Sequence, residues 1–169
     1  MPADVLVAYG SKHGSTREIA EAIAETFRSK CVDARAESAL TADPHDARAV
    51  VVGAALYTGR IHAHALRFLR AYEETLAELP LAVFGSGPRT LEPEDITSSL
   101  RQLRSGLQRA VPRLRPVSLM VFGGAVDPHV LRWPFSRMPA FDARDWDAVR
   151  DWTIELAARR DFLETPAIR

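Results

Sequence analysis

Small and hydroxyl-bearing residues crowd into one turn near the start of the chain. The turn lies in VAYGSKHGSTREIA, residues 7–20, between an apolar run and a segment with helical periodicity. Its small and hydroxyl-bearing residues are Gly10, Ser11, Gly14, Ser15 and Thr16. The first amides of a helix have no intrahelical acceptor, and the helix dipole is positive at that end. A strand, a tight turn and a helix start therefore make a site for an anion. The alternative is that Ser15 only caps the helix, in a capping box with Glu18.

Two common phosphate-binding motifs are absent from this turn. It lacks the G-x-G-x-x-G of dinucleotide-binding proteins, and no Gly-Lys-Ser/Thr follows at the spacing of a Walker loop. What remains is a cradle of hydroxyls and backbone amides without an obligatory cation. Such a cradle fits a terminal phosphate monoester.

The elements that position this turn alternate between strands and helices. Apolar runs that end in glycine or alanine predict buried parallel strands at residues 5–10, 50–54, 81–87 and 118–125, and residues 32–37 alternate like an edge strand. Apolar side chains at helical spacing predict helices at residues 19–27, 66–76, 96–107 behind Pro93, and from 145 onward with Trp146, Val149, Thr153 and Leu156 on one stripe. This alternation predicts one doubly wound α/β domain over residues 1–169. In such a sheet, ligands bind beyond the carboxyl ends of the strands.

Composition restricts the classes of partner. Of the 169 residues 47% are hydrophobic and the formal net charge is zero, so no global field favours nucleic acid or a membrane. Cys31 is the single cysteine, which rules out an internal disulfide. No apolar run approaches a membrane span, and the first ten residues lack the pattern of a secretion signal, so we expect a cytoplasmic protein. Residues 101–115 carry five arginines and no acid, which predicts either a solvated helix face or a docking patch for an acidic partner or anionic lipid.

The segment VLVAYGSKHGSTREIAEAIAETF, residues 5–27, resembles the first strand, phosphate loop and first helix of flavodoxin-like proteins. The resemblance implies a three-layer sandwich with a five-stranded parallel sheet in the order 2-1-3-4-5, helices on both faces, and FMN as the cofactor. Three further segments are similar to the group that includes menaquinone-dependent protoporphyrinogen oxidase. They are VVVGAALYTGRIHAHALRFL at 50–69, FGGAVDP with LRWPF at 122–135, and RDWDAVRDW at 144–152.

The resemblance also implies which residues contact FMN. Its phosphate would be surrounded by Ser11, Lys12, His13, Gly14, Ser15 and Thr16. His13 departs from the flavodoxin pattern, which has a hydroxyl residue there. One face and edge of the ring would be met by Ala55, Leu56, Tyr57, Thr58 and Gly59, with Tyr57 stacking and a carbonyl of Thr58 or Gly59 accepting from reduced flavin N5. The other side would be bordered by Ser86, Gly87, Pro88, Gly124, Ala125 and Asp127.

The chemistry around the flavin leaves several assignments open. Arg60 and Arg89 are either cations near the ring or ordinary loop arginines, and His62 either lines the site or only starts a helix. His62 and His64 are two positions apart, so we expect them not to share a helix face and assign no metal site. No catalytic residue follows from spacing.

The identity of the partner is open as well. Trp133 and Phe135 either plug a loop onto the body or form a wall of a substrate pocket. The connection from Pro128 to Asp145 is shorter than the family's quinone-associated insertion, which argues against quinone and porphyrin use. Three functions compete. They are an FMN oxidoreductase that uses a redox partner protein or a small-molecule acceptor such as a quinone, a carrier flavodoxin, and a cofactor-free interaction module.

Overall fold

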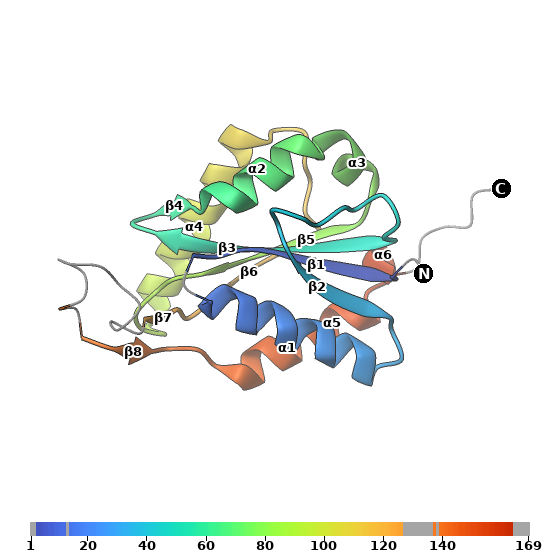
Figure 1. The fold of residues 1–169 in the computed structure, drawn as a ribbon. Coiled ribbons are helices and arrows are strands. Elements are labelled where there is room, and N and C mark those ends of the chain that lie inside the picture. Colours follow the sequence, from blue (N-terminus) through green and yellow to red (C-terminus); the bar gives the residue numbers. More distant parts are fainter. Residues whose placement is uncertain (1–2, 13, 127–136, 138, 164–169) are drawn as a thin grey trace.

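The computed structural model describes residues 3–12, 14–126, 137 and 139–163, and its centre is one parallel sheet (Figure 1). The five parallel strands are β1 (Val5–Gly10), β2 (Ala34–Ser38), β3 (Ala49–Tyr57), β5 (Leu81–Ser86) and β6 (Ser118–Phe122). They lie in the order β2-β1-β3-β5-β6. Counted among the parallel strands alone, this is the order 2-1-3-4-5, so the predicted fold is confirmed.

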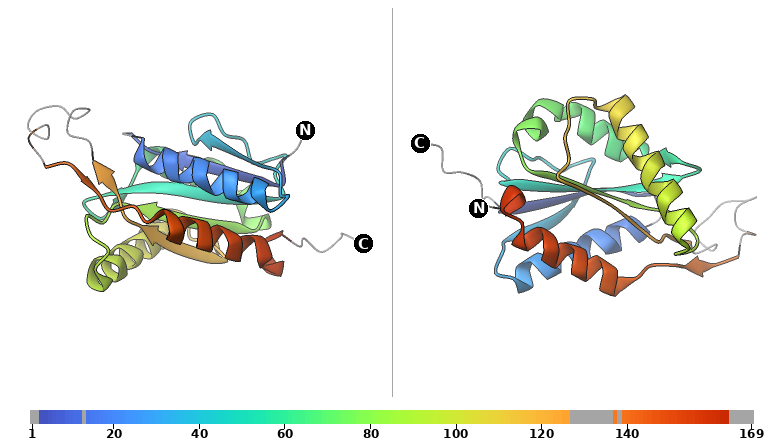
Figure 2. Two further views of the ribbon diagram at one scale, coloured as in Figure 1. Left: turned by 90° about the horizontal axis from the view of Figure 1, so that it is seen from below. Right: turned by 180° about the vertical axis from the view of Figure 1, so that it is seen from behind.

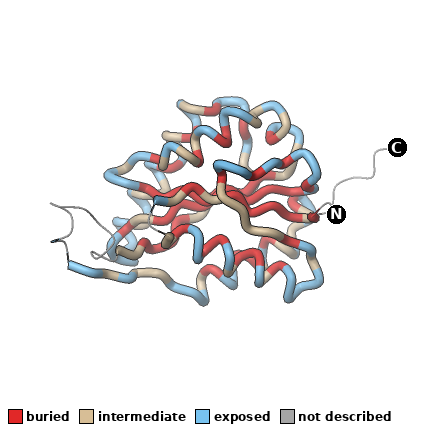
Figure 3. The backbone as a smooth tube through the Cα atoms, viewed as in Figure 1, coloured by how far each residue is buried: buried red, intermediate tan, exposed pale blue. Residues whose placement is uncertain are grey.

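Continuous apolar strands arise because both faces of the sheet are covered. In β1, Val5 and Val7 face one core while Leu6 and Ala8 face the other, and all four are fully buried. Figure 3 shows the same burial along the central strands. A strand that alternated apolar and polar residues would leave one of these two cores incomplete.

The helices form two layers, one on each face of the sheet (Figures 1 and 2). The lower layer in Figure 1 holds α1 (Ser15–Ser29), α5 (Trp146–Ala158) and α6 (Arg160–Leu163), with α1 and α5 side by side. The upper layer holds α2 (Ala63–Ala71), α3 (Glu73–Glu78) and α4 (Pro93–Ala110). Since each crossover helix begins where a strand ends, the N-termini of α1, α2 and α4 all lie at the carboxyl edge of the sheet.

Two helix predictions need correction. The segment 66–76 is not one helix, because Tyr72 leaves the helical conformation (φ −113°, ψ 21°), which separates α2 from α3. Trp146 is also not on the buried stripe of α5, since it is 43% exposed under the guanidinium of Arg144. Trp152 takes the core position instead and contacts the rings of Phe84 and Phe122 edge-on.

Three short strands were not predicted, and all lie at the carboxyl edge of the sheet. Strand β4 (Arg60–Ile61) folds back on β3 as an antiparallel hairpin. Strands β7 (Ala125–Val126) and β8 (Phe141–Asp142) pair with each other beyond the end of β6. At the opposite, amino edge, exposed Cys31 follows α1 in a left-handed turn with φ 61°.

Candidate functional site

The turn after β1 presents the start of α1 without a side-chain cap. Its N-cap is Gly14, in the left-handed region at φ 90°, and no side chain caps the helix there. Ser15 is the first residue of the helix, so the predicted capping box with Glu18 is wrong: glycine supplies the turn that the capping residue would have made. The backbone N–H of Gly14 donates to Oγ of Ser11 at 3.1 Å, which folds the loop back toward the strand end.

Thr16 fastens this turn to the middle of the sheet. Its side chain is fully buried, and its hydroxyl shares a 2.7 Å hydrogen bond with the hydroxyl of Ser86 at the end of β5. Ser86 is only 2% exposed, so the bond is sheltered from water. The structure therefore brings together two predicted site residues that are 70 positions apart. Ser11 and Ser15 are half-buried and Lys12 is exposed.

The hairpin between β3 and β4 carries the predicted ring contacts Tyr57, Thr58 and Gly59. Thr58 (φ 47°) and Gly59 (φ 77°) both adopt the left-handed conformation that a two-residue hairpin turn requires. For Thr58 that conformation is strained, because its side chain is branched at Cβ. Tyr57 is 40% exposed and lies beside the phosphate loop. Burial raises the pKa of its phenol, and a hydrogen bond from the backbone N–H of Lys12 opposes that rise.

The remaining predicted contacts at the strand ends are packed against one another. Ala55, Leu56 and Pro88 are buried, and Ala125 is half-buried in β7. A Cβ added to Gly87 would lie 2.6 Å from the carbonyl oxygen of Leu56, and one added to Gly124 would lie 3.0 Å from Cα of Gly87. Glycine is required at both positions because the strand ends approach backbone to backbone. Contacts of these buried residues with a ligand would therefore use the main chain.

A segment that sequence reasoning missed crosses the same edge, around residues 139–145. Arg144 is only 12% exposed at its side chain; it bonds Asp142 at 2.8 Å and also pairs with Glu18 in the first turn of α1. Arg89 lies over the ring of Phe141, 5.0 Å from the centroid. The only sequence signal was RDWDAVRDW, which marks the helix after this segment but not the contacts that the segment makes.

His62 lies at the start of a helix, which is one of the two roles predicted for it. It is the N-cap of α2, and its Nδ1 accepts from the backbone N–H of His64 at 3.3 Å. The two residues were expected not to share a helix face, but His62 precedes the helix as its N-cap, and its ring contacts that of His64 at 4.6 Å between centroids. Within the described part of the chain, no three His, Cys, Asp or Glu residues gather as metal ligands.

Four residues of the earlier predictions lie outside the described residues, namely His13, Asp127, Trp133 and Phe135. Most of the connection from Pro128 to Asp145 lies outside them as well. In the described part of the chain, no helix has the length and apolar character to cross a membrane.

Comparison with known proteins decides the family. The model of the flavodoxin domain family matches residues 6–138. The chain belongs to the flavodoxin domain family. Its cofactor is accordingly FMN and its class of chemistry is electron transfer. No curated protein matches the chain.

Solved flavodoxin structures share the fold. A mutant flavodoxin from Pseudomonas aeruginosa is 19% identical with a TM-score of 0.57, over 91% of this chain and 96% of that one. Oxidised Flavodoxin 1 from Bacillus cereus is 16% identical with a TM-score of 0.57, over 89% and 95%. The rubredoxin oxygen:oxidoreductase of Desulfovibrio gigas is 17% identical with a TM-score of 0.54, over 90% of this chain and 35% of that one. At these identities the likeness shows the fold alone.

The phosphate loop fits the phosphate of FMN. The fit rests on the start of α1, where no side chain caps the helix, and on the half-buried hydroxyls of Ser11 and Ser15. The side chain of Glu18, the acidic residue in the first turn, is instead paired with Arg144.

Proposed function

We propose that this flavodoxin-domain protein holds FMN at the carboxyl edge of its sheet and passes electrons between a donor and an acceptor. The observation that carries the proposal is the uncapped N-terminus of α1 directly behind β1. Bound FMN would supply the redox chemistry, because its ring takes up and releases electrons that protein side chains cannot.

The residues around the site have separate tasks in this proposal. The hydroxyls of Ser11 and Ser15 and the first amides of α1 bind the phosphate, and Lys12 adds a positive charge beside it. The hydroxyl of Thr16 is already bonded to Ser86, so it positions the loop rather than binding the ligand. The ring of Tyr57 would exclude water from one face of the flavin, and the carbonyl of Thr58 or Gly59 would accept a hydrogen bond from N5–H of the reduced flavin.

The more specific proposal is an oxidoreductase that resembles menaquinone-dependent protoporphyrinogen oxidase and works in the cytoplasm. The sequence segments at 50–69 and 144–152 support it, and so does the net charge of zero, since carrier flavodoxins are usually strongly acidic, whereas the short connection from Pro128 to Asp145 argues against quinone and porphyrin use. Oxidation of protoporphyrinogen by the FMN-loaded protein with added menaquinone tests this proposal. A loaded protein that only exchanges electrons with other redox proteins would instead be a carrier.

The cofactor is tested by titrating the purified protein with FMN and with riboflavin, which lacks the phosphate. We expect quenching of FMN fluorescence, weaker binding of riboflavin, and a higher melting temperature with FMN. A ligand at 100 times its Kd stabilises the folded state by about 2.7 kcal/mol. Unchanged fluorescence and melting temperature at saturating FMN would favour the cofactor-free interaction module.

Ser15→Asp separates binding from folding. A carboxylate at the first position of α1 interacts favourably with the helix dipole, so we expect unchanged or slightly higher stability. The same carboxylate repels phosphate, so FMN binding should weaken while riboflavin binding does not. Ser98→Asp, at an exposed position of α4, is the matched control and should leave both ligands unaffected.

A further inference from the structure

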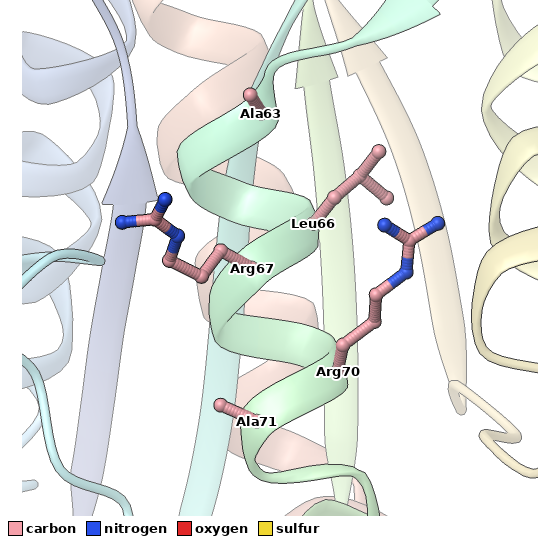
Figure 4. A pocket seen from close by; sticks show the side chains of 5 residues that line it. All are labelled: Ala63, Leu66, Arg67, Arg70 and Ala71. Carbon is pink, nitrogen blue, oxygen red and sulfur yellow. The ribbon is translucent and has the colours of Figure 1, made fainter.

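The outward side of α2 forms a basic surface with an apolar strip. Figure 4 shows Arg67 and Arg70 reaching out on opposite sides of the helix around a shallow hollow, which is also lined by Ala63, Leu66 and Ala71. Both arginines are exposed, and α2 has no acidic residue in its nine positions. The three apolar residues are small or half-buried, so another protein chain can approach the helix closely here.

Several other arginines of the described chain are neutralised by ion pairs, and Arg67 and Arg70 are not. Arg17, Arg35, Arg48, Arg113, Arg144, Arg150 and Arg159 each form an ion pair with a carboxylate of this protein. Within the residues that the structure describes, no carboxylate pairs with Arg67 or Arg70. Their positive charge is therefore available to a partner.

The neighbouring helix of the same layer adds to this charge. Of the five arginines in residues 101–115, Arg113 pairs with Glu74, and Arg115 donates to the carbonyls of Pro112 and Leu114. The other three, on α4, are exposed and have no ion pair within the described residues; they are Arg101, Arg104 and Arg109. Because α2 itself carries no acidic residue, the positive charge of Arg67 and Arg70 is not offset within this helix, although the whole chain is neutral.

The chemistry of the surface distinguishes between two classes of anionic partner. A guanidinium binds a carboxylate through two parallel hydrogen bonds, so a pair of arginines around an apolar strip matches acidic side chains that flank an apolar one. A helix that lies on a membrane needs large apolar side chains to insert. The large apolar residues that the described chain exposes are Leu40, Tyr57, Leu91 and Trp146, and none of them is on α2.

We infer that the outer face of α2, centred on Arg67 and Arg70, docks an acidic segment of a partner protein in which carboxylates flank an apolar residue. The inference does not depend on FMN, because this face is formed by the helix itself.

The test uses a short, fluorescently labelled peptide of alternating Glu and Leu, and its Gln–Leu counterpart, with the full-length protein. We expect the acidic peptide to bind at low salt, to weaken as salt rises, and to bind better than the Gln peptide. Arg67→Gln/Arg70→Gln should weaken binding at least about tenfold, the equivalent of about 1.4 kcal/mol. Arg67→Lys/Arg70→Lys keeps the charge but loses the bidentate geometry, so its affinity should be intermediate.

The matched control is Arg17→Gln/Arg150→Gln, which changes the net charge equally on the opposite layer. It should leave peptide binding unchanged, and circular dichroism should show that both double variants are folded. The inference is overturned if the acidic peptide does not bind at low salt, or if both double variants weaken it equally. It is also overturned if Arg67 and Arg70 are needed for binding to phosphatidylglycerol vesicles or for self-association in sedimentation, and not for peptide binding.

Discussion

The hydrogen bond between Thr16 and Ser86 gives a sharp test of how the phosphate loop is held. Both side chains are buried, and their hydroxyls are 2.7 Å apart. Thr16→Val replaces the hydroxyl by a methyl group of similar size and leaves the Ser86 hydroxyl buried without its partner. A buried polar group that loses its partner costs about 1–3 kcal/mol. Ser86→Ala should cost a similar amount, because it orphans the Thr16 hydroxyl.

The double variant is expected to be less destabilised than the sum of the two single changes. When both hydroxyls are absent, no unsatisfied group remains, and replacing both partners of a hydrogen bond by apolar groups is nearly neutral. The two sites should therefore couple by about 1 kcal/mol or more.

Urea unfolding measures these free energies, and the melting temperature gives a second readout. For a protein of this size, each kcal/mol shifts the melting temperature by about 2–4 °C, so either single change should lower it by about 2–12 °C. Thr26→Val is the matched control on the same helix: its hydroxyl only donates to the Ala22 carbonyl, and the loss should stay within about 0.5 kcal/mol. Additive single effects, or a loss no larger than that of Thr26→Val, would refute the role given to this bond.

Three further predictions concern the carboxyl edge of the sheet. Gly123→Ala should destabilise the protein by about 1–3 kcal/mol in urea unfolding, because the added Cβ would run into the backbone of Ala143; wild-type stability would mean that the segment at 139–145 moves freely. The Arg144 guanidinium lowers the pKa of Asp142, so the stability that Asp142 contributes is complete above its unfolded pKa of about 3.9 and is lost as the pH falls through the lower, folded pKa. The stability gap between the wild type and Asp142→Asn should therefore narrow in urea unfolding as the pH falls below about 4, and a gap independent of pH contradicts the pair. Burial raises the pKa of Tyr57, so its phenolate should appear in ultraviolet difference spectra against Tyr57→Phe with a midpoint above a pH of about 10, and a midpoint at about 10 would place the phenol in water.

Much of the architecture is readable from the sequence because it depends on local pattern. Strand β1 has its predicted bounds, and α4 follows Pro93 as expected, since an unbroken apolar run and a proline at the first turn are strong local signals. The order of the parallel strands came from resemblance, and the structure has the same order.

The predictions that failed share a physical cause, because the features concerned depend on contacts between residues far apart in the sequence. Trp146 and Trp152 both fall in an amphipathic segment, and only the position of Phe84 and Phe122 makes Trp152 the buried one. Tyr72 continues the helical period of α2, yet its backbone leaves the helix at a point where its ring contacts that of the distant His45. The hydroxyl pair at the site was also beyond sequence reasoning, because nothing local to Thr16 points to Ser86.

The position of Cys31 has a practical consequence. It is the single thiol in the sequence, it is exposed, and it lies in the turn between α1 and β2, at the end of the sheet away from the phosphate loop. A maleimide dye can be attached there, and a gold electrode bound to this thiol would hold the protein at the amino edge of the sheet, with the phosphate loop at the carboxyl edge facing the solution. Voltammetry of a protein immobilised in this orientation could follow its redox chemistry without engineering a new attachment point.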